Sequence, residues 1–184
     1  MAIALAHSIR TPRLTLRRMT AADAPRVYEI QSNWNVTRML RMASFPPTLD
    51  ELRHWLARHE AEWLSGAAYR FALVAEERVI GCADVDEIAS DSGDLGYWLD
   101  EAYWGRGLAS EAAAAVRDFA LDSVGLKRLL SGHAADNPAS GRVLTKLGFR
   151  FLRDATSWSR SRQETIIHRK YELVAAGNDA ARRS

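Results

Sequence analysis

The chain has 184 residues, of which 47% are hydrophobic and 26% are charged, and its net charge is +2. This length and composition predict a single globular domain, and so small a net charge gives no argument for binding to nucleic acid or to an acidic membrane surface. A single cysteine, Cys82, excludes an internal disulfide and a cysteine metal cluster, which is consistent with a reducing compartment.

The first part of the chain has one strand pattern followed by helix patterns. The apolar run at residues 2–6 is too short for a signal peptide, and no segment has the length of a membrane span, so we expect a cytoplasmic protein. Residues 14–18 alternate as a strand, and residues 20–31 predict a helix. A short helix over residues 33–42 follows, and a longer, capped helix covers residues 48–65.

The rest of the chain is predicted to alternate strands with two helices. The predicted strands cover residues 69–75, 79–88, 94–99, 127–134, 149–153 and 165–174. The predicted helices cover residues 108–124 and 138–147, with Asn137 as the cap of the second and Gly148 at its end. No linker divides residues 1–184, so we expect one domain with its core at residues 9–174 and a loose tail at residues 175–184.

A loop with two glycines joins the strand at residues 94–99 to the alanine-rich helix. Gly105 and Gly107 let backbone N–H groups turn toward a ligand, because neither residue has a Cβ atom. The first turn of the helix adds unpaired N–H groups and the positive end of its dipole. The loop therefore predicts a site for a phosphate or pyrophosphate group. The alternative is a tight strand-to-helix turn that binds nothing.

Two separated motifs favour the first interpretation. Trp104-Gly-Arg-Gly-Leu-Ala109 resembles the acyl-coenzyme A pyrophosphate loop of the GNAT acetyltransferases, and Asn137-Pro-Ala-Ser140 with residues 144–149 resembles their second signature. The spelling Tyr-Trp-Gly-x-Gly-x-Ala-x-Glu and residues 11–18 are similar to the RimJ/RimL branch, which acetylates protein N-termini. The resemblance covers roughly residues 9–174 and implies a mixed α/β (α+β) fold, with a mostly antiparallel central sheet flanked by helices.

The resemblance also implies acetyl-CoA as the acetyl donor. The strand backbone at residues 98 and 99 would pair with the pantetheine arm, and a peptide N–H there could polarise the thioester carbonyl. Asn137 is explained equally by a contact to the pantetheine region and by its place as a helix cap. The implied cofactor-binding residues are Trp98, Leu99, Trp104, Gly105, Arg106, Gly107, Leu108, Ala109, Ser110, Asn137 and Ser140.

The catalytic residues are harder to assign. Leu144 stands where many GNAT enzymes carry a tyrosine that protonates the departing thiolate, and leucine cannot donate a proton. Ser140 lies on the same helix face and is the nearest substitute, directly or through water. Asp94 opens the strand that meets the thioester and is our candidate base, with Asp84 and Asp86 on the preceding strand as alternatives.

The lack of an evident strong base favours an acceptor that is readily neutral. An α-amine has a pKa near ~8 and a lysine near ~10.4, a difference of roughly 3 kcal/mol in reaching the neutral nucleophile. We therefore predict an N-acetyltransferase that acts on a protein or peptide N-terminus, uses no metal, and is a monomer or homodimer. The alternatives are an acetyltransferase for small-molecule amines or antibiotics and a non-catalytic acyl-coenzyme A sensor.

Overall fold

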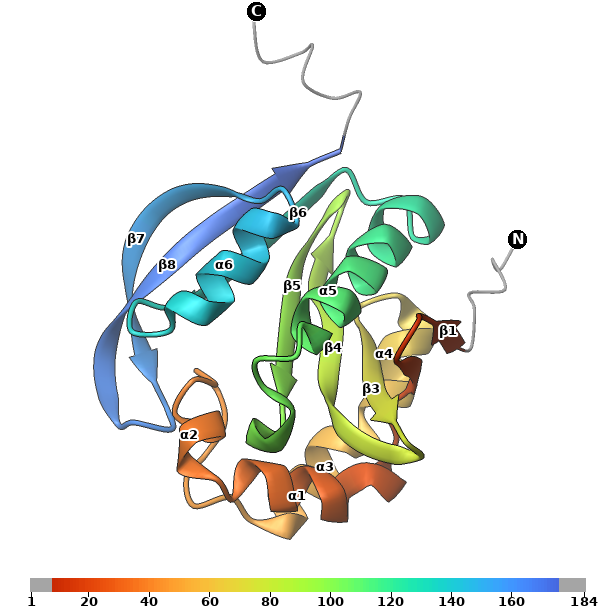
Figure 1. The fold of residues 1–184 in the computed structure, drawn as a ribbon, viewed down its shortest axis with the longest axis vertical. Helices are drawn as coiled ribbons and strands as arrows, with labels where there is room; N and C mark the ends of the chain where they lie inside the picture. The colour runs from red at the N-terminus through yellow and green to blue at the C-terminus, as the bar shows by residue number, and fades with distance from the viewer. Residues whose placement is uncertain (1–7, 176–184) are drawn as a thin grey trace, which may run out of the picture.

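The computed structural model describes residues 8–175, which form one eight-stranded sheet with helices on both faces (Figure 1). The apolar run at residues 2–6 and the predicted tail, apart from Ala175, lie outside these residues. Across the sheet the strands are β1 (Ser8–Arg10), β2 (Thr15–Arg18), β3 (Tyr69–Ala75), β4 (Arg78–Ala89), β5 (Ser92–Leu99), β6 (Arg128–Ala134), β8 (Glu164–Val174) and β7 (Arg150–Ser159).

Every neighbouring pair of strands is antiparallel except β5 and β6, which are parallel. A parallel pair needs a crossover connection, and the helix α5 (Leu108–Asp118) supplies it. The predicted mixed fold with a mostly antiparallel sheet is confirmed. Within the described residues, no helix is both long enough and apolar enough to cross a membrane.

Each face of the sheet carries its own apolar layer. On one side, which we call the α5 face, α5 and α6 (Pro138–Lys146) lie over the middle of the sheet, as Figure 1 shows. Val116 and Leu144 are fully buried there. On the other side, the α1 face, Val27 of α1 (Ala24–Gln31) and Leu56 of α3 (Leu49–Ala57) pack on the sheet.

The predicted helix at residues 48–65 is divided at Arg58 into α3 and α4 (His59–Ser65). Leu56 of α3 belongs to the apolar layer of the α1 face, whereas Trp63 of α4 packs edge-on against Phe71 in the layer of the α5 face. One straight helix cannot reach both layers, so the chain changes direction between them.

The strand β1 was not predicted, and three other elements differ most from their predicted bounds. The helix predicted at residues 33–42 is the single turn α2 (Trp34–Thr37). α5 ends at Asp118 and continues as a wider π-type turn over Phe119–Ser123, where Val124 N–H donates to Phe119 O at 3.0 Å. β7 continues to Ser159, six residues beyond the predicted 153, because it pairs with β8 along its length.

Candidate active site

The loop before α5 has the backbone form that its glycines require. Gly105 and Gly107 have φ angles of 74° and 76°, in the left-handed region that other residues rarely adopt. A Cβ added to Gly105 would meet no atom within 4 Å, and one added to Gly107 would lie 3.5 Å from Arg13. These glycines are therefore needed for the backbone conformation rather than for space within the protein.

Gly107 is the residue that precedes α5, and it has no side chain to cap the helix. The first bond of the helix runs from Glu111 N–H to Gly107 O at 3.1 Å, which leaves the N–H groups of Leu108, Ala109 and Ser110 pointing out of the helix end. A helix of this length with an uncapped N-terminus is suited to bind an anion.

The first turn of α5 also contains an acidic side chain, which is neutralised from the other end of the chain. Arg13 donates from Nε to Glu111 Oε2 at 2.6 Å and from Nη1 to Arg106 O at 2.7 Å, and Thr11 donates to Glu111 Oε1 at 2.6 Å. Burial raises the pKa of Glu111, but the hydrogen bonds from Thr11 and Arg13 outweigh it and lower that pKa. The segment at residues 11–13 thus holds the glycine loop in place, and it neutralises the Glu111 carboxylate so that this charge does not repel an anion.

Beside this loop, β5 and β6 separate and leave a cavity between them. The two strands pair at Ser92, Gly93 and Asp94, and the last link is the hydrogen bond from Ser131 Oγ to Leu95 O at 2.7 Å. The cavity has a volume of about 440 Å³ and extends from α2 to α6. We call it the β5–β6 cavity.

The β5–β6 cavity gathers most of the predicted cofactor residues. Those that line it are Trp98, Leu99, Trp104, Gly105, Gly107, Leu108, Ala109, Ser110, Asn137 and Ser140. Arg106 is not among them: its guanidinium lies over the ring of Tyr103 at 5.3 Å. Arg142 and Lys146 of α6 also line the cavity and supply positive charge that the sequence motifs did not reveal.

The backbone N–H and C=O groups of successive β5 residues point alternately to the cavity and to β4. Asp100 N–H donates to Ile80 O on the β4 side, whereas Leu99 O accepts from Trp104 Nε1 at 3.0 Å and Leu95 O accepts from Ser131 on the other side. By this alternation the N–H of Leu99 faces the cavity, and the polar backbone groups of Trp98 face β4. Of the two predicted backbone positions, only Leu99 is therefore open to a ligand.

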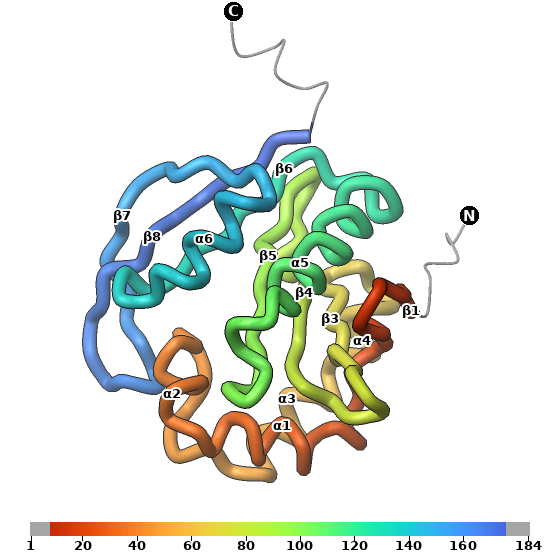
Figure 2. The backbone as a smooth tube through the Cα atoms, in the orientation of Figure 1, coloured from red at the N-terminus to blue at the C-terminus, as the bar shows by residue number. Residues whose placement is uncertain are grey.

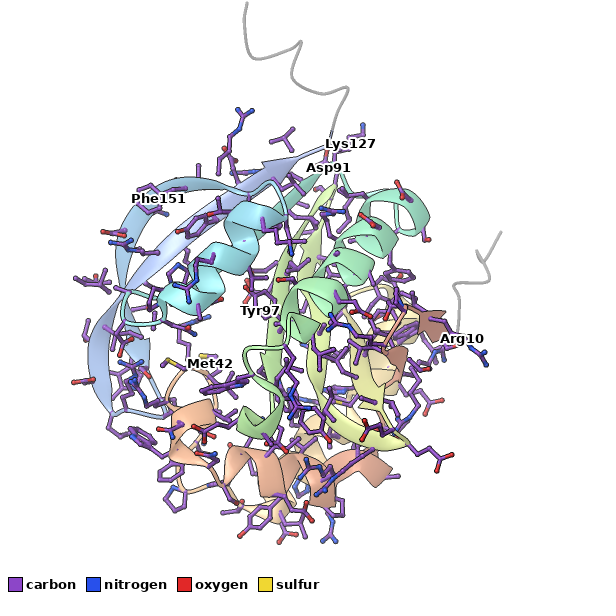
Figure 3. The ribbon with its side chains drawn as sticks, viewed as in Figure 1. Arg10, Met42, Asp91, Tyr97, Lys127 and Phe151 are labelled. Carbon is purple, nitrogen blue, oxygen red and sulfur yellow. The ribbon has the colours of Figure 1, made fainter. Side chains whose placement is uncertain are left out.

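Ser140 has a partner that the sequence did not suggest. Tyr97 lies on β5 in the space between α5 and α6 (Figure 3), and its Oη lies 2.8 Å from Ser140 Oγ and 3.1 Å from Ser140 O. Burial raises the pKa of Tyr97 to about 12, against the opposing effect of the Ser140 hydrogen bond, so the hydroxyl stays protonated. Leu144 is fully buried in the core, and the Asn137 side chain caps α6 by accepting from Ser140 N–H at 3.3 Å.

The predicted base, Asp94, lies on the α1 face of the sheet and does not line the cavity. Burial raises the pKa of Asp94 to about 6, against the opposing effect of Lys170. Within residues 8–175, no ion pair holds this carboxylate. A half-buried carboxylate with no ion-pair partner and a raised pKa is suited to accept a proton.

The alternative candidates for the base, Asp84 and Asp86, are both engaged in ion pairs. Both pair with Arg70, at 3.5 Å and 2.9 Å, and Glu62 binds the same guanidinium. Burial and the neighbouring Asp86 raise the pKa of Asp84 to about 7. These carboxylates belong to an internal ion cluster under α4, which leaves Asp94 as the unpaired one.

Comparison with known proteins places these features in context. Residues 13–150 match the GNAT acetyltransferase domain family. The N-acetyltransferase p20 of Bacillus licheniformis is 30% identical over 155 residues, which are 80% of this chain and 86% of that protein. The ribosomal-protein-serine acetyltransferase of Escherichia coli is 33% identical over 86 residues, 46% of this chain and 48% of its own.

Solved structures share the fold at low identity. The ribosomal protein acetyltransferase RimL, in complex with coenzyme A, has a TM-score of 0.83 at 17% identity and covers 93% of this chain and 99% of its own. The ribosomal-protein-S5-alanine acetyltransferase of Vibrio fischeri has a TM-score of 0.80 at 20% identity, with coverages of 92% and 97%.

Proposed function

The chain belongs to the GNAT acetyltransferase domain family, and on that premise we propose that it transfers the acetyl group of acetyl-CoA to the α-amine of a protein or peptide N-terminus. It is an acetyl-CoA-dependent acetyltransferase by family. The likeness to ribosomal-protein acetyltransferases supports the choice of acceptor. We further propose that residues 1–184 act as one catalytic domain in the cytoplasm.

The observation that carries this proposal is the joining of three features in one cavity: the uncapped helix end, the free edge of β5, and the Tyr97–Ser140 pair. Acetyl-CoA supplies an activated acetyl group on sulfur. The N–H groups of Leu108, Ala109 and Ser110 would hold its pyrophosphate, with Arg142 and Lys146 adding positive charge. The Leu99 N–H would stabilise the charge that develops on the thioester oxygen.

Ser140 and Tyr97 would assist the departure of the thiolate. If Tyr97 Oη donates to Ser140 Oγ, the hydroxyl proton of Ser140 is left to point at the sulfur. On the α1 face, Asp94 would take the proton that the amine loses on attack. These roles were assigned to Ser140 and Asp94 from sequence, and Tyr97 is added because of its 2.8 Å contact with Ser140.

The pKa of Asp94 bears on the choice of amine. With that pKa at about 6, moving a proton to it costs roughly 3 kcal/mol from an α-ammonium with a pKa near ~8, but roughly 6 kcal/mol from a lysine near ~10.4. The margin of about 3 kcal/mol in favour of the α-amine is the difference between the two amines, and a base with a pKa of about 6 leaves a cost to be met for either of them.

A matched pair of peptides tests the acceptor. One peptide has a free N-terminal serine and an acetylated lysine, and the other has an acetylated N-terminus and a free lysine. We expect release of free thiol from acetyl-CoA and a mass gain of one acetyl group with the first peptide only. Faster acetylation of the second, or transfer to small amines alone, would contradict the α-amine proposal.

A further inference from the structure

A buried histidine without a hydrogen-bond partner lies on the α1 face of the sheet. His168, on β8, is 9% exposed, and its Nδ1 has no partner among the described residues. An unpaired buried nitrogen of this kind costs folding free energy unless a ligand or water binds to it. Sequence analysis did not single out His168, because no motif includes it.

The ring of His168 lies directly over Gly132 of β6. A Cβ added to Gly132 would lie 2.7 Å from His168 Cε1 and 2.9 Å from Nδ1, so a glycine is required for the ring to occupy this place. Gly132 also lines the β5–β6 cavity. The Nδ1 edge of the imidazole therefore packs on Gly132, a residue of the cavity wall, although His168 is not itself among the residues that line the cavity.

The strand register brings Asp94 and His168 to one region of the α1 face. Asp94 pairs with Leu130 of β6, and Gly132 is two residues further on, a step of roughly 6.6 Å along the strand. Lys170 pairs with Gly132, and His168 pairs with Ala134. The three side chains His168, Lys170 and Asp94 thus share one face where β5 and β6 have begun to separate.

The charged groups around this region favour a neutral ligand. Burial, together with the nearby Lys170, Arg41 and His133, lowers the pKa of His168 to about 4. Lys170 and Arg41 also act on Asp94 and oppose the rise of its pKa. The same two cations would disfavour an ammonium ion here and lower the pKa of a bound amine, while His168 stays uncharged at neutral pH.

We propose that His168 binds the acceptor amine, with its Nδ1 accepting a hydrogen bond from the neutral nitrogen as this attacks from the α1 face. The inference rests on the proposed function and deepens it. It divides the reaction between the two faces of the sheet: thiolate departure on the α5 face, and amine binding and deprotonation on the α1 face. A neutral imidazole with its proton on Nε2 has the lone pair on Nδ1 that this requires.

Two substitutions separate the effect of the His168 Nδ1 atom from the effect of the ring's shape. His168→Phe keeps the ring but removes both nitrogens, and His168→Asn keeps an acceptor near the position of Nδ1. We expect His168→Phe to lower kcat/KM for a peptide with a free N-terminal serine by about tenfold or more, the size of one hydrogen bond to a reacting group. His168→Asn should recover much of this loss.

A bisubstrate compound, in which the sulfur of coenzyme A is joined through an acetyl bridge to the α-nitrogen of the same peptide, gives a readout besides activity. His168→Phe should weaken its binding about tenfold while the affinity for coenzyme A stays unchanged. His59→Phe is the matched control: His59 is 4% exposed with both nitrogens unpaired, but it packs on Trp55 away from the cavity. It should change stability and not acceptor binding.

The outcomes distinguish the two proposals. A wild-type protein that acetylates no peptide α-amine refutes the proposed function. A wild-type protein that does so, with His168→Phe equal to it in kcat/KM and in bisubstrate affinity, overturns the role of His168. If His168→Phe does not fold, the ¹⁵N resonance of Nδ1 in the wild-type protein decides: it should shift on adding the bisubstrate compound but not coenzyme A, and an equal response to both overturns the proposal.

Discussion

Removing the hydroxyl of Tyr97 tests how the thiolate is stabilised as it leaves. A full proton transfer is unfavourable, because the pKa of Tyr97 is about 12 and that of a thiol is near ~8.5, a gap worth roughly 5 kcal/mol. A hydrogen bond to a charged group contributes ~1.5–3 kcal/mol, which corresponds to about ten- to 150-fold in rate. We therefore expect Tyr97→Phe to lower kcat by this amount, with the thiolate protonated by solvent after it departs.

The assay is the release of free thiol at saturating acetyl-CoA, for Tyr97→Phe, Ser140→Ala and the double variant. Because the two hydroxyls lie 2.8 Å apart, each single variant should lose most of what the double variant loses. Thr145→Val is the control, since it removes a hydroxyl of α6 that bonds only Gly141 O at 3.0 Å. Losses below threefold in both single variants, or losses that multiply in the double variant, would refute the reasoning.

Three further predictions concern the loop and the base. Gly107→Val should weaken coenzyme A binding at least tenfold by calorimetry. Gly125 also has a positive φ and lies in open space, so Gly125→Val is the control. Both variants should lose the ~1–2 kcal/mol of folding stability that backbone strain costs, but Gly125→Val should keep its affinity for coenzyme A. Glu111→Gln should weaken coenzyme A binding by releasing Arg13, and equal affinities of the variant and the wild type at pH 7 would argue against this. Because the pKa of Asp94 rises to about 6 on folding, from ~3.9, stability falls as the pH rises between these values. In urea unfolding, Asp94→Asn should thus be more stable than the wild type by about 3 kcal/mol at pH 7 and by little near pH 4. Its acetyl transfer should fall, and unchanged activity would remove Asp94 as the base.

The sequence predicted the parts of the fold that depend on local pattern. Gly148 ends α6 at a φ of 90°, and Asn137 caps it, as their residue types indicated. The break at Arg58 was not predicted, because the apolar periodicity continues through residues 48–65. That break depends on which of two apolar layers each half contacts, and the helical pattern carries no information on this.

The same limit applies to the site. The glycine loop is local in sequence and was predicted, whereas the Tyr97–Ser140 contact joins residues 43 positions apart. Tyr97 shares one strand face with Leu95 and Leu99, and this pattern does not distinguish it from a core residue. His168 was missed for a related reason: its environment is created by Gly132 on another strand.

In the proposed mechanism, the alternation of side chains along β5 places the two halves of the reaction on opposite faces of a single strand. Tyr97 projects to the α5 face and Asp94 to the α1 face, while the Leu99 N–H points along the sheet into the cavity. A slip of one residue in this strand would exchange all three directions. The register is held by contacts at both ends: Asp100 pairs with Arg26, and Ser131 bonds Leu95 O.

The α2 side of the cavity is held in place by a strand hairpin that is distant in sequence. Figure 2 shows the turn between β7 and β8 reaching the segment after α2. There Arg160 N–H donates to Arg41 O at 2.8 Å, and Arg162 Nε donates to Arg38 O at 2.7 Å. Arg41 is one of the cations that act on Asp94 and His168, so this hairpin holds a positive charge beside the proposed acceptor site. Acceptor selectivity should therefore depend on the hairpin turn, even though no sequence motif of the family lies in it.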